Sequence, residues 1–383
     1  MKQKAVILGS TGSIGRSALS VLDSLGANWR AAGLAAGSRS AELAEQANRY
    51  RPDALAIADA DRAREVELSL SYSPKIFTGD EALTRLVEEV PADCVVCAFV
   101  GVCGLLATLR AVELGRRIGL ANKEAMVVAG SLLMPMARAS GATLIPVDSE
   151  HSAIFQALQA GRRQDVRTVY LTASGGPFRT WSWDELEGVT PEEALRHPTW
   201  NMGPKITVDS ATMMNKALEI VEARWLFDLD PDQIKVVVHP ESIVHSLVEF
   251  CDGSMVAQLG TPDMRTPIQY ALTYPGRAAC PSPRLDLLNT PSLTFEAPDP
   301  ERFPALRLGY EVARRGGTCG AVLNAANEAA VELFRAGAIG YRDIACLAER
   351  ALQEHDFQQS PTLDDLMRAD RWARQEVHRC KTC

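Results

Sequence analysis

The feature that most constrains the fold is an alternation of short apolar runs with helix-length segments through residues 1–150. Repeated strand–helix–strand units of this kind predict an α/β domain with a doubly wound parallel sheet. A glycine motif, Gly9–Gly15, follows the first apolar run and opens a helix. Such glycines let the backbone approach a pyrophosphate at a helix N-terminus, so the motif predicts a Rossmann-like dinucleotide site. A strand–helix turn with incidental glycines would show the same spacing.

Strands in this region are expected at Val6–Gly9, Ala31–Ala36, Ala54–Ala58, Lys75–Phe77, Cys94–Phe99, Ile118–Ala121 and Thr143–Val147. Helices are expected between most of them, at Ser17–Leu25, Ala41–Tyr50, Ala82–Val90 and Leu105–Leu114. The pattern then becomes mixed, with strands expected at Thr168–Thr172, Val236–His239, Ile243–Phe250 and Met255–Leu259. The last two are predicted to form a hairpin, so this region is expected to be α+β.

A Pro-rich stretch over Ala279–Pro304 has no helical period and predicts a connector. Amphipathic helices are expected after it, at Ala305–Arg315, Ala321–Ala336, Tyr341–His355 and Thr362–Val377, which predicts a C-terminal helical bundle. The expected domains are a Rossmann-like dinucleotide-binding domain (1–148), an α+β domain (149–278), a connector (279–304) and a C-terminal α-helical domain (305–383).

Composition limits the classes of partner. The net charge of −8 argues against a nucleic-acid-binding surface, although it leaves room for a local phosphate pocket. No apolar run reaches transmembrane length, and Met1–Lys4 leads into a strand without a signal-peptide core. A soluble cytoplasmic protein without a membrane partner is therefore expected.

Nine cysteines include two pairs with the spacing of a redox or zinc motif, Cys94/Cys97 and Cys380/Cys383. The first pair lies in an expected strand, where residues i and i+3 face opposite sides of the sheet. The second pair ends the chain without a partner pair nearby and lacks the aliphatic residues of a prenylation box. Reduced, structural cysteines are expected.

Two acidic segments suggest a metal site. Asp148 and Glu150 end an expected strand, where spacing i, i+2 would put both carboxylates on one side of an extended backbone. The segment Asp209–Glu219 is expected to be one helix, with Asn215, Lys216 and Glu219 on the same face. Three carboxylates would suit a hard divalent cation. A turn and a solvated polar helix face would give the same pattern.

Other polar residues follow expected strands, where ligands bind in such sheets. Ser38 and Arg39 offer a hydroxyl and a guanidinium instead of the acidic residue of an NAD site, which favours NADP, although Arg39 would also suit a helix start. Lys123 would hold a phosphate or a carbonyl oxygen, or begin a helix. Ser174 lies in a Gly-rich turn of the kind that binds phosphate. The loop His197–Lys205 would close over a substrate, unless His197 is an ordinary surface or packed histidine.

In chain order, the motifs are Gly9–Gly15, Leu120–Glu124, Pro146–Glu150, Leu171–Phe178, Arg196–Trp200, Val208–Lys216, His239–His245 and Gly260–Pro267. Together they resemble the 1-deoxy-D-xylulose 5-phosphate reductoisomerase family over nearly the full length. The family forms 2-C-methyl-D-erythritol 4-phosphate in the non-mevalonate isoprenoid pathway.

The resemblance implies a role for each matching residue. It implies ligands for Mg²⁺, Mn²⁺ or Co²⁺ at Asp148, Glu150 and Glu219, which also count as catalytic with Lys123 and His197. It implies substrate contacts at Lys123, Ser149, Glu150, Ser174, His197, Trp200, Ser210, Asn215, Lys216 and Glu219. It implies NADPH contacts at Thr11, Gly12, Ser13, Ile14, Gly37, Asn122, Glu124 and Gly203, with Trp200 and Met202 in a closing flap.

The chain departs from the family pattern at Gly37-Ser38-Arg39, where Lys or Arg directly after Gly, and then Asn, is more usual. Ser38 and Arg39 therefore remain alternatives for the 2′-phosphate. The implied enzyme is an NADPH-dependent oxidoreductase that rearranges a sugar phosphate and works as a homodimer. Two other classes compete with it: a metal-dependent NADP sugar-phosphate dehydrogenase without rearrangement, and a non-catalytic dinucleotide-binding sensor.

Overall fold

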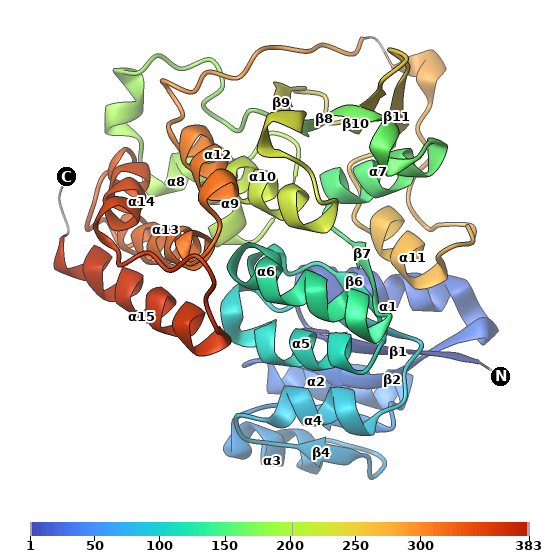
Figure 1. The fold of residues 1–383 in the computed structure, drawn as a ribbon. Coiled ribbons are helices and arrows are strands. Elements are labelled where there is room, and N and C mark those ends of the chain that lie inside the picture. The colour runs from blue at the N-terminus through green and yellow to red at the C-terminus, as the bar shows by residue number, and fades with distance from the viewer. Residues whose placement is uncertain (1, 201, 291, 381–383) are drawn as a thin grey trace. The chain divides into compact units, whose positions relative to one another are not determined.

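The structure is a computed structural model that describes residues 2–200, 202–290 and 292–380 (Figure 1). Asn201 of the expected flap and Cys383 lie outside the described residues. The chain divides into two compact units. The first comprises Met1–Ala125, Leu133–Ser152 and Asp263–Pro283, and the second comprises Met126–Leu132, Ala153–Pro262 and Arg284–Cys383. The domain boundaries expected from the sequence stay a prediction.

The first unit contains a sheet of seven parallel strands in the order β4-β3-β2-β1-β5-β6-β7. The strands are β1 (Gln3–Leu8), β2 (Trp29–Ala35), β3 (Ala54–Ala56), β4 (Lys75–Phe77), β5 (Cys94–Cys97), β6 (Arg117–Leu120) and β7 (Thr143–Pro146). Continuous burial of β1 from Ala5 to Leu8 reflects helices on both faces of the sheet. The predicted doubly wound parallel sheet is confirmed.

Most helices of this unit alternate with its strands along the chain (Figure 1). They are α1 (Ser13–Leu25), α2 (Ser40–Tyr50), α3 (Ala60–Leu68), α4 (Ala82–Glu89), α5 (Leu105–Glu113), α6 (Lys123–Ser140) and α11 (Arg265–Thr273), and α6 runs through both units. Right-handed crossovers place α1 to α3 on one face of the sheet and α4 and α5 on the other. Helices α3 and α11 were not predicted from the sequence, and a helix start was one of the alternatives open for Lys123.

The second unit contains a mixed four-stranded sheet in the order β11-β10-β8-β9. Its strands are β8 (Val166–Ala173), β9 (Ile234–Val238), β10 (Val244–Phe250) and β11 (Met255–Leu259). β8 and β9 are parallel, whereas β10 is antiparallel to both β8 and β11. The predicted hairpin of β10 and β11 is confirmed, as is the α+β character of this region.

The helices of the second unit are α7 (Ser149–Ala157), which begins in the first unit, α8 (Pro191–Ala194), α9 (Pro204–Ala211), α10 (Met214–Leu226), α12 (Ala305–Arg315), α13 (Cys319–Arg335), α14 (Asp343–Glu354) and α15 (Leu363–Arg379). The last four form the helical C-terminal region that the sequence predicted. Among the described residues between α11 and α12, the regular structure is a short 3-10 turn at Leu287–Asn289 and a bridge from Glu296 to Val238. None of the described helices has the length and apolar content needed to span a membrane.

The cysteines agree with the expectation at most positions. Cys94 and Cys97 are free and buried in β5, and burial raises the pKa of Cys94 to about 12 and that of Cys97 to about 11. These thiols are therefore unreactive packing groups. Cys346 is disulfide-bonded, so the expectation of reduced thiols is wrong there.

Helix α10 forms the centre of the core of the second unit. Its residues from Ala217 to Ala223 are buried, and α12 packs directly against it. The two backbones approach closely at Gly309 of α12, where an added Cβ would lie 2.6 Å from the Cα of Ala217 and 2.7 Å from its carbonyl oxygen. Only a residue without a side chain permits this contact. Gly309 thereby fixes the position of the helix that carries Asn215, Lys216 and Glu219.

We expect Gly309→Ala to destabilise the protein by about 1–3 kcal/mol, because a methyl group must push two packed backbones apart. Thermal unfolding followed by circular dichroism checks this. The matched control is Gly188→Ala, since a Cβ there meets nothing within 4 Å. Equal midpoints for the two variants would contradict the close-approach argument.

Candidate active site

The glycine motif forms a tight turn at the carboxyl end of β1. The amides of Gly9 and Ser10 both donate to the carbonyl of Ala35, at 3.0 and 2.8 Å. Gly9 has φ +92°, and a Cβ on it would lie 2.8 Å from the carbonyl oxygen of Ala98, just past β5. Because β1 lies between β2 and β5, this turn lies where the strand order reverses, which is the usual ligand crevice in such sheets.

The start of α1 suits a bound anion. Gly12 precedes the helix as its N-cap and supplies no side chain to cap the first amides. Gly15 lies in the first turn, and a Cβ there would overlap the carbonyl oxygen of Gly9 and the backbone of Ser10. The first-turn N–H groups and the helix dipole together favour a negative ligand. The turn thus has the backbone geometry that the sequence predicted for Thr11, Gly12, Ser13 and Ile14.

The end of β2 brings a guanidinium to the same turn. Arg39 donates from Nη1 to the carbonyl of Thr11 at 2.6 Å, and Arg16 donates to the same oxygen at 3.0 Å. Gly37, Ser38 and Arg39 are all exposed. Arg62, which the sequence analysis did not select, donates to the carbonyl of Ser38. The structure therefore places Arg39 beside the glycine turn, where its guanidinium also forms an ion pair with Glu42 at 3.6 Å.

Asn122, which comes soon after β6, caps the helix that follows it. Its side chain accepts from the amide of Ala125 at 2.7 Å and so caps α6, while its Nδ2 donates to the carbonyl of Gly101 at 2.8 Å. Lys123 and Glu124 form the first turn of that helix, and both are buried. A carboxylate at this end complements the helix dipole. Lys123 begins α6, as one of the predicted alternatives has it, and its contact with a phosphate or a carbonyl oxygen stays a prediction.

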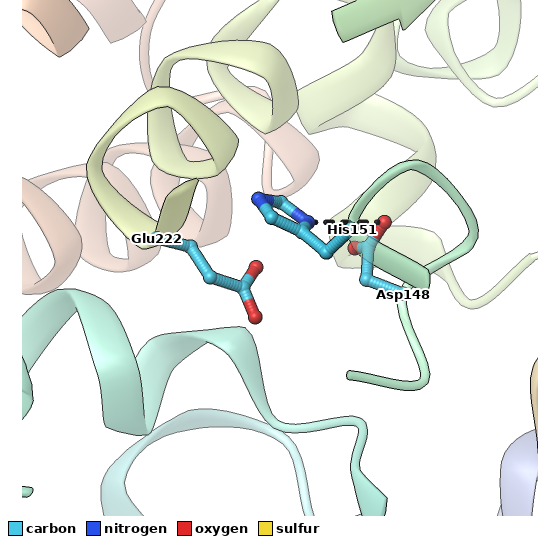
Figure 2. A group of neighbouring side chains, drawn as sticks. All are labelled: Asp148, His151 and Glu222. Carbon is cyan, nitrogen blue, oxygen red and sulfur yellow. Dashed lines mark ion pairs between the residues drawn. The ribbon is translucent and has the colours of Figure 1, made fainter. Parts of the chain in front are cut away.

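Asp148, at the end of β7, is a buried carboxylate held between two cationic or potentially cationic groups. Lys123 Nζ forms an ion pair with its Oδ2, and His151 Nδ1 lies 3.7 Å from its Oδ1 (Figure 2). Burial opposes ionisation, but Lys123 and His151 outweigh it and hold the pKa of Asp148 well below its usual range. Asp148 is therefore a charged carboxylate at neutral pH, and its role as a metal ligand stays a prediction.

The sequence argument for the placement of Glu150 was wrong. Helix α7 begins at Ser149, and the amide of Ser152 donates to the carbonyl of Asp148 at 2.8 Å, so the backbone is helical rather than extended. Asp148 and Glu150 still offer carboxylate oxygens within 4.8 Å of each other. The hydroxyl of Ser149 donates to Glu150. The pair is thus assembled by a helix start and not by the alternation of a strand.

Two further residues drawn in Figure 2 were not selected from the sequence. His151 is fully buried beside Asp148 on the first turn of α7, and Glu222 is fully buried on α10. The sequence does contain a signal for both residues, because residues spaced i, i+3 lie on the same face of a helix. His151 follows Asp148 by three residues, and Glu222 follows Glu219 by three.

The polar face of α10 contains three of the expected site residues. Asn215 Nδ2 donates to Glu219 Oε1 at 2.5 Å, and Lys216 Nζ pairs with Glu219 Oε2. These contacts confirm the predicted i, i+4 and i, i+3 pairs, and Lys216 and Glu219 are buried. The expectation of one helix over 209–219 was wrong, because α9 ends at Ala211 and Met213 adopts a left-handed backbone with φ +59°. Ser210 lies on α9, before this break.

The Gly-rich turn after β8 lies against α9. Gly175 and Gly176 have φ of +84° and +68°, and the Gly176 amide donates to Ser174 Oγ at 3.2 Å. A Cβ on Gly176 would lie 2.7 Å from the carbonyl oxygen of Ser210. The structure therefore brings Ser174 and Ser210 onto adjoining segments, as a phosphate pocket requires.

His197 joins the loop before α9 to this turn. Its Nδ1 accepts from the amides of Thr199 and Trp200 at 3.1 and 2.9 Å, and its Nε2 lies 3.0 Å from Ser174 Oγ. An Nδ1 that accepts two hydrogen bonds carries no proton, so Nε2–H donates to Ser174. Burial lowers the pKa of His197, which favours this neutral form. His197 is therefore an organising residue of the loop and not a simple surface histidine.

The loop itself is shorter than expected. Helix α9 begins at Pro204 with Gly203 as its N-cap, so Lys205 is helical and pairs with Asp209 at 2.8 Å. The ring of Trp200 lies 6.4 Å from that of His245, and Met202 is half-buried. Whether the loop acts as a flap stays a prediction.

The fold and these turns define a doubly wound, Rossmann-like α/β protein whose second unit brings the Gly-rich turn after β8 against Ser210. Comparison with known families is more specific. Residues 5–130 match the model of 1-deoxy-D-xylulose 5-phosphate reductoisomerase, residues 144–227 match its C-terminal domain, and residues 259–376 match the DXP reductoisomerase C-terminal domain. The chain belongs to the 1-deoxy-D-xylulose 5-phosphate reductoisomerase family.

Individual relatives agree over the full length. The chain is 51% identical to the 1-deoxy-D-xylulose 5-phosphate reductoisomerase of Pelodictyon phaeoclathratiforme, over 96% of this chain and 97% of the relative. The structure of the Zymomonas mobilis enzyme in complex with NADPH superposes with a TM-score of 0.94 at 41% identity, covering 100% of this chain and 99% of the other. A DOX-P reductoisomerase with NADPH, fosmidomycin and magnesium gives a TM-score of 0.93 at 40% identity, covering 99% and 98%.

The two nitrogens of His197 can be tested separately. We expect His197→Asn to keep the amide of Trp200 protected from hydrogen exchange, because the Asn oxygen can accept from amides two and three residues ahead. His197→Gln, which can extend a donor toward Ser174 but has no acceptor at the Nδ1 position, should lose that protection. Hydrogen exchange by NMR measures both, and long-range ¹H–¹⁵N spectra of the unmodified protein should show a protonated Nε2. A protonated Nδ1 at pH 7 would contradict this assignment.

Proposed function

We propose that the protein rearranges 1-deoxy-D-xylulose 5-phosphate and reduces the product with NADPH to 2-C-methyl-D-erythritol 4-phosphate, a step of non-mevalonate isoprenoid biosynthesis. The observation that carries the proposal is the family match, which extends over almost the whole chain. The geometry supports it with an anion-binding helix start in the first unit and a Gly-rich turn beside Ser210 in the second.

NADPH is the proposed cofactor. The glycine turn fits a pyrophosphate, because Gly9 and Gly15 leave the turn free of side-chain bulk and Gly12 leaves the first amides of α1 without a side-chain cap. The Arg39 guanidinium lies beside this turn and provides a partner for a 2′-phosphate. The proposed contacts are Thr11, Gly12, Ser13, Ile14, Gly37, Ser38, Arg39, Asn122, Glu124 and Gly203.

A divalent cation, Mg²⁺, Mn²⁺ or Co²⁺, is the second proposed cofactor. The donor chemistry fits, since Asp148 is held ionised and Glu150 offers an oxygen close to it. We assign Glu219 as the third ligand. Its contacts with Asn215 and Lys216 fix the orientation of its carboxylate on α10.

The substrate phosphate is assigned to the pocket of the second unit. Ser174 and Ser210 supply hydroxyls, while Asn215 and Lys216 supply an amide and an ammonium group. Ser174 and His197 lie within hydrogen-bond distance of each other, at 3.0 Å, so both groups are close enough to contact the same phosphate. Binding a remote phosphate supplies energy that orients the reacting end of the substrate.

The remaining residues position the reacting carbons. When bound, the cation polarises a carbonyl as a Lewis acid and NADPH supplies hydride. Lys123 and Ser149 are assigned to the substrate near these carbons, with Lys123 paired to Asp148. The loop from His197, with Trp200, excludes water while the rearranged aldehyde awaits reduction.

Two other functions predict different products. A metal-dependent NADP dehydrogenase without rearrangement would give an unbranched polyol phosphate, and a dinucleotide-binding sensor would give none. We expect incubation of the protein with 1-deoxy-D-xylulose 5-phosphate, NADPH and Mg²⁺ to give a branched polyol phosphate by ¹³C NMR. An unbranched product, or no NADPH consumption, would overturn the proposal.

A cytoplasmic homodimer is the proposed working form. Strand β11 lies at the edge of its sheet and exposes Met255 and Leu259, and the connector exposes Leu288 and Phe295. An apolar edge strand on the surface is a suitable place for a second copy.

Removal of a metal ligand should abolish turnover. We expect Glu150→Gln and Glu219→Gln to lower kcat/KM by at least about 100-fold, because a hard cation loses a charged oxygen ligand. Steady-state kinetics with added Mg²⁺ measures this loss. Glu192→Gln, at an exposed glutamate of α8, is the control and should leave kcat/KM unchanged. Full turnover in excess chelator would refute a metal requirement.

The cofactor preference should depend on Arg39. We expect NADPH to be favoured over NADH and Arg39→Ala to narrow the gap by about 1.5–3 kcal/mol, the size of charge-assisted hydrogen bonds to a phosphate. Comparison of kcat/KM for the two cofactors tests this. The exposed Arg64→Ala on α3 serves as control. Equal efficiency with both cofactors in the unmodified enzyme would disprove the preference.

A further inference from the structure

The walls of the proposed phosphate pocket are connected to the C-terminal helices by buried hydrogen bonds. Helix α9 ends at Ala211, just before its break with α10. The carbonyls of Val208 and Ser210 accept from the amides of Thr212 and Met213, whereas the carbonyl of Ala211 accepts from the hydroxyl of Tyr341 at 2.6 Å. Tyr341 lies between α13 and α14, and only 5% of it is exposed.

The ring of Tyr341 contacts the other wall of the same pocket. It packs edge-on against Phe178, with ring centres 5.4 Å apart, and Phe178 ends the Gly-rich segment that begins at Ser174. It also packs against Phe334 of α13 at 6.2 Å. One buried side chain therefore contacts the segment of Ser174 through its ring and the residue after Ser210 through its hydroxyl.

A second link lies one residue before Ser210. Asp209 is 1% exposed, and its Oδ1 accepts from Asn327 Nδ2 of α13 at 2.8 Å, while its Oδ2 pairs with Lys205. A buried carboxylate requires such partners, so this contact fixes the side of α9 that faces α13. Ser210 is thus flanked on both sides by residues bonded to the C-terminal helical region.

We propose that Tyr341 and Asn327 are positioning residues for phosphate. They hold α9 in a fixed position relative to the Gly-rich turn after β8. Four side chains thereby converge on one anion: Ser174, Ser210, Asn215 and Lys216. The proposal rests on the proposed function for the identity of the phosphate ester, but not for the existence of the pocket. It gives the C-terminal helices a specific task in substrate binding.

The test compares Tyr341→Phe with Tyr310→Phe. Tyr310 also donates its hydroxyl to a backbone carbonyl of this unit, that of Ile234 at 3.0 Å, but Ile234 begins β9 at the end opposite to the one beside Ala173. We expect Tyr341→Phe to raise KM for the sugar phosphate about tenfold, as the loss of one buried hydrogen bond implies, with KM for NADPH unchanged. Tyr310→Phe should leave both KM values unchanged. Equal KM values for the two variants, or a parallel rise of both KM values in Tyr341→Phe, would overturn the proposal.

The hydrogen bond between Asn327 and Asp209 is tested by exchanging the two side chains. Asn327→Asp places two carboxylates together and should raise KM for the sugar phosphate. The double variant Asp209→Asn/Asn327→Asp restores one donor and one acceptor and should recover much of the loss. If KM in the double variant stays as high as in Asn327→Asp, Asn327 is not a positioning residue.

Titration with inorganic phosphate separates this proposal from the function. We expect phosphate to shift the amide signals of Gly175 and Gly176, with affinity about tenfold weaker in Tyr341→Phe and unchanged in Tyr310→Phe. If the unmodified protein binds phosphate but does not turn over the sugar phosphate, the proposed function is wrong. The phosphate affinities of the two variants still test the positioning role of Tyr341. The same affinity in all three proteins, or no binding in any, would reject the positioning role.

Discussion

Parallel strands all end at the same edge of a sheet, and this constraint locates the polar groups of the first unit. Gly9 follows β1, Gly37 comes soon after β2, and Asn122 and Asp148 come soon after β6 and β7. Residues far apart in sequence therefore meet at one edge, as the close approach of Gly9 to Ala98 shows. The parallel pair β8 and β9 repeats the arrangement in the second unit, where the amide of His239 donates to the carbonyl of Ala173, next to Ser174.

Buried charge is the second constraint on the site. Taking a carboxylate out of water costs several kcal/mol unless a partner is at hand. Lys123 meets this need at Asp148, and Lys216 meets it at Glu219. At Asp148 the neighbouring Lys123 and His151 keep the pKa of the carboxyl well below its usual range, so this carboxylate is charged at neutral pH. The ammonium groups thus stabilise the buried carboxylates of both units through ion pairs.

Local sequence signals were sufficient for the strands, the glycine turn and the helical pairs of Glu219, because each depends on neighbours within one element. They were insufficient where the backbone changes direction. The start of α7 was mistaken for an extended segment because three residues, Asp148 to Glu150, are too few to show a period. The left-handed Met213 has no local signal, since methionine rarely adopts φ +59° without support from elsewhere in the fold.

That support is non-local. The carbonyl of Ala211 is satisfied by a side chain 130 residues further along the chain, and Asp209 by one 118 residues further along. The Gly176 turn adds a contact of another kind, because its position beside the Ser210 carbonyl requires the absence of a Cβ. A sequence motif can therefore identify the groups proposed to bind phosphate, but the placement of α9 depends on contacts with Asn327 and Tyr341 of the C-terminal region. The proposed site is for this reason sensitive to substitutions far from it in sequence, since a shift of α9 by a few tenths of an ångström moves Ser210 relative to Ser174.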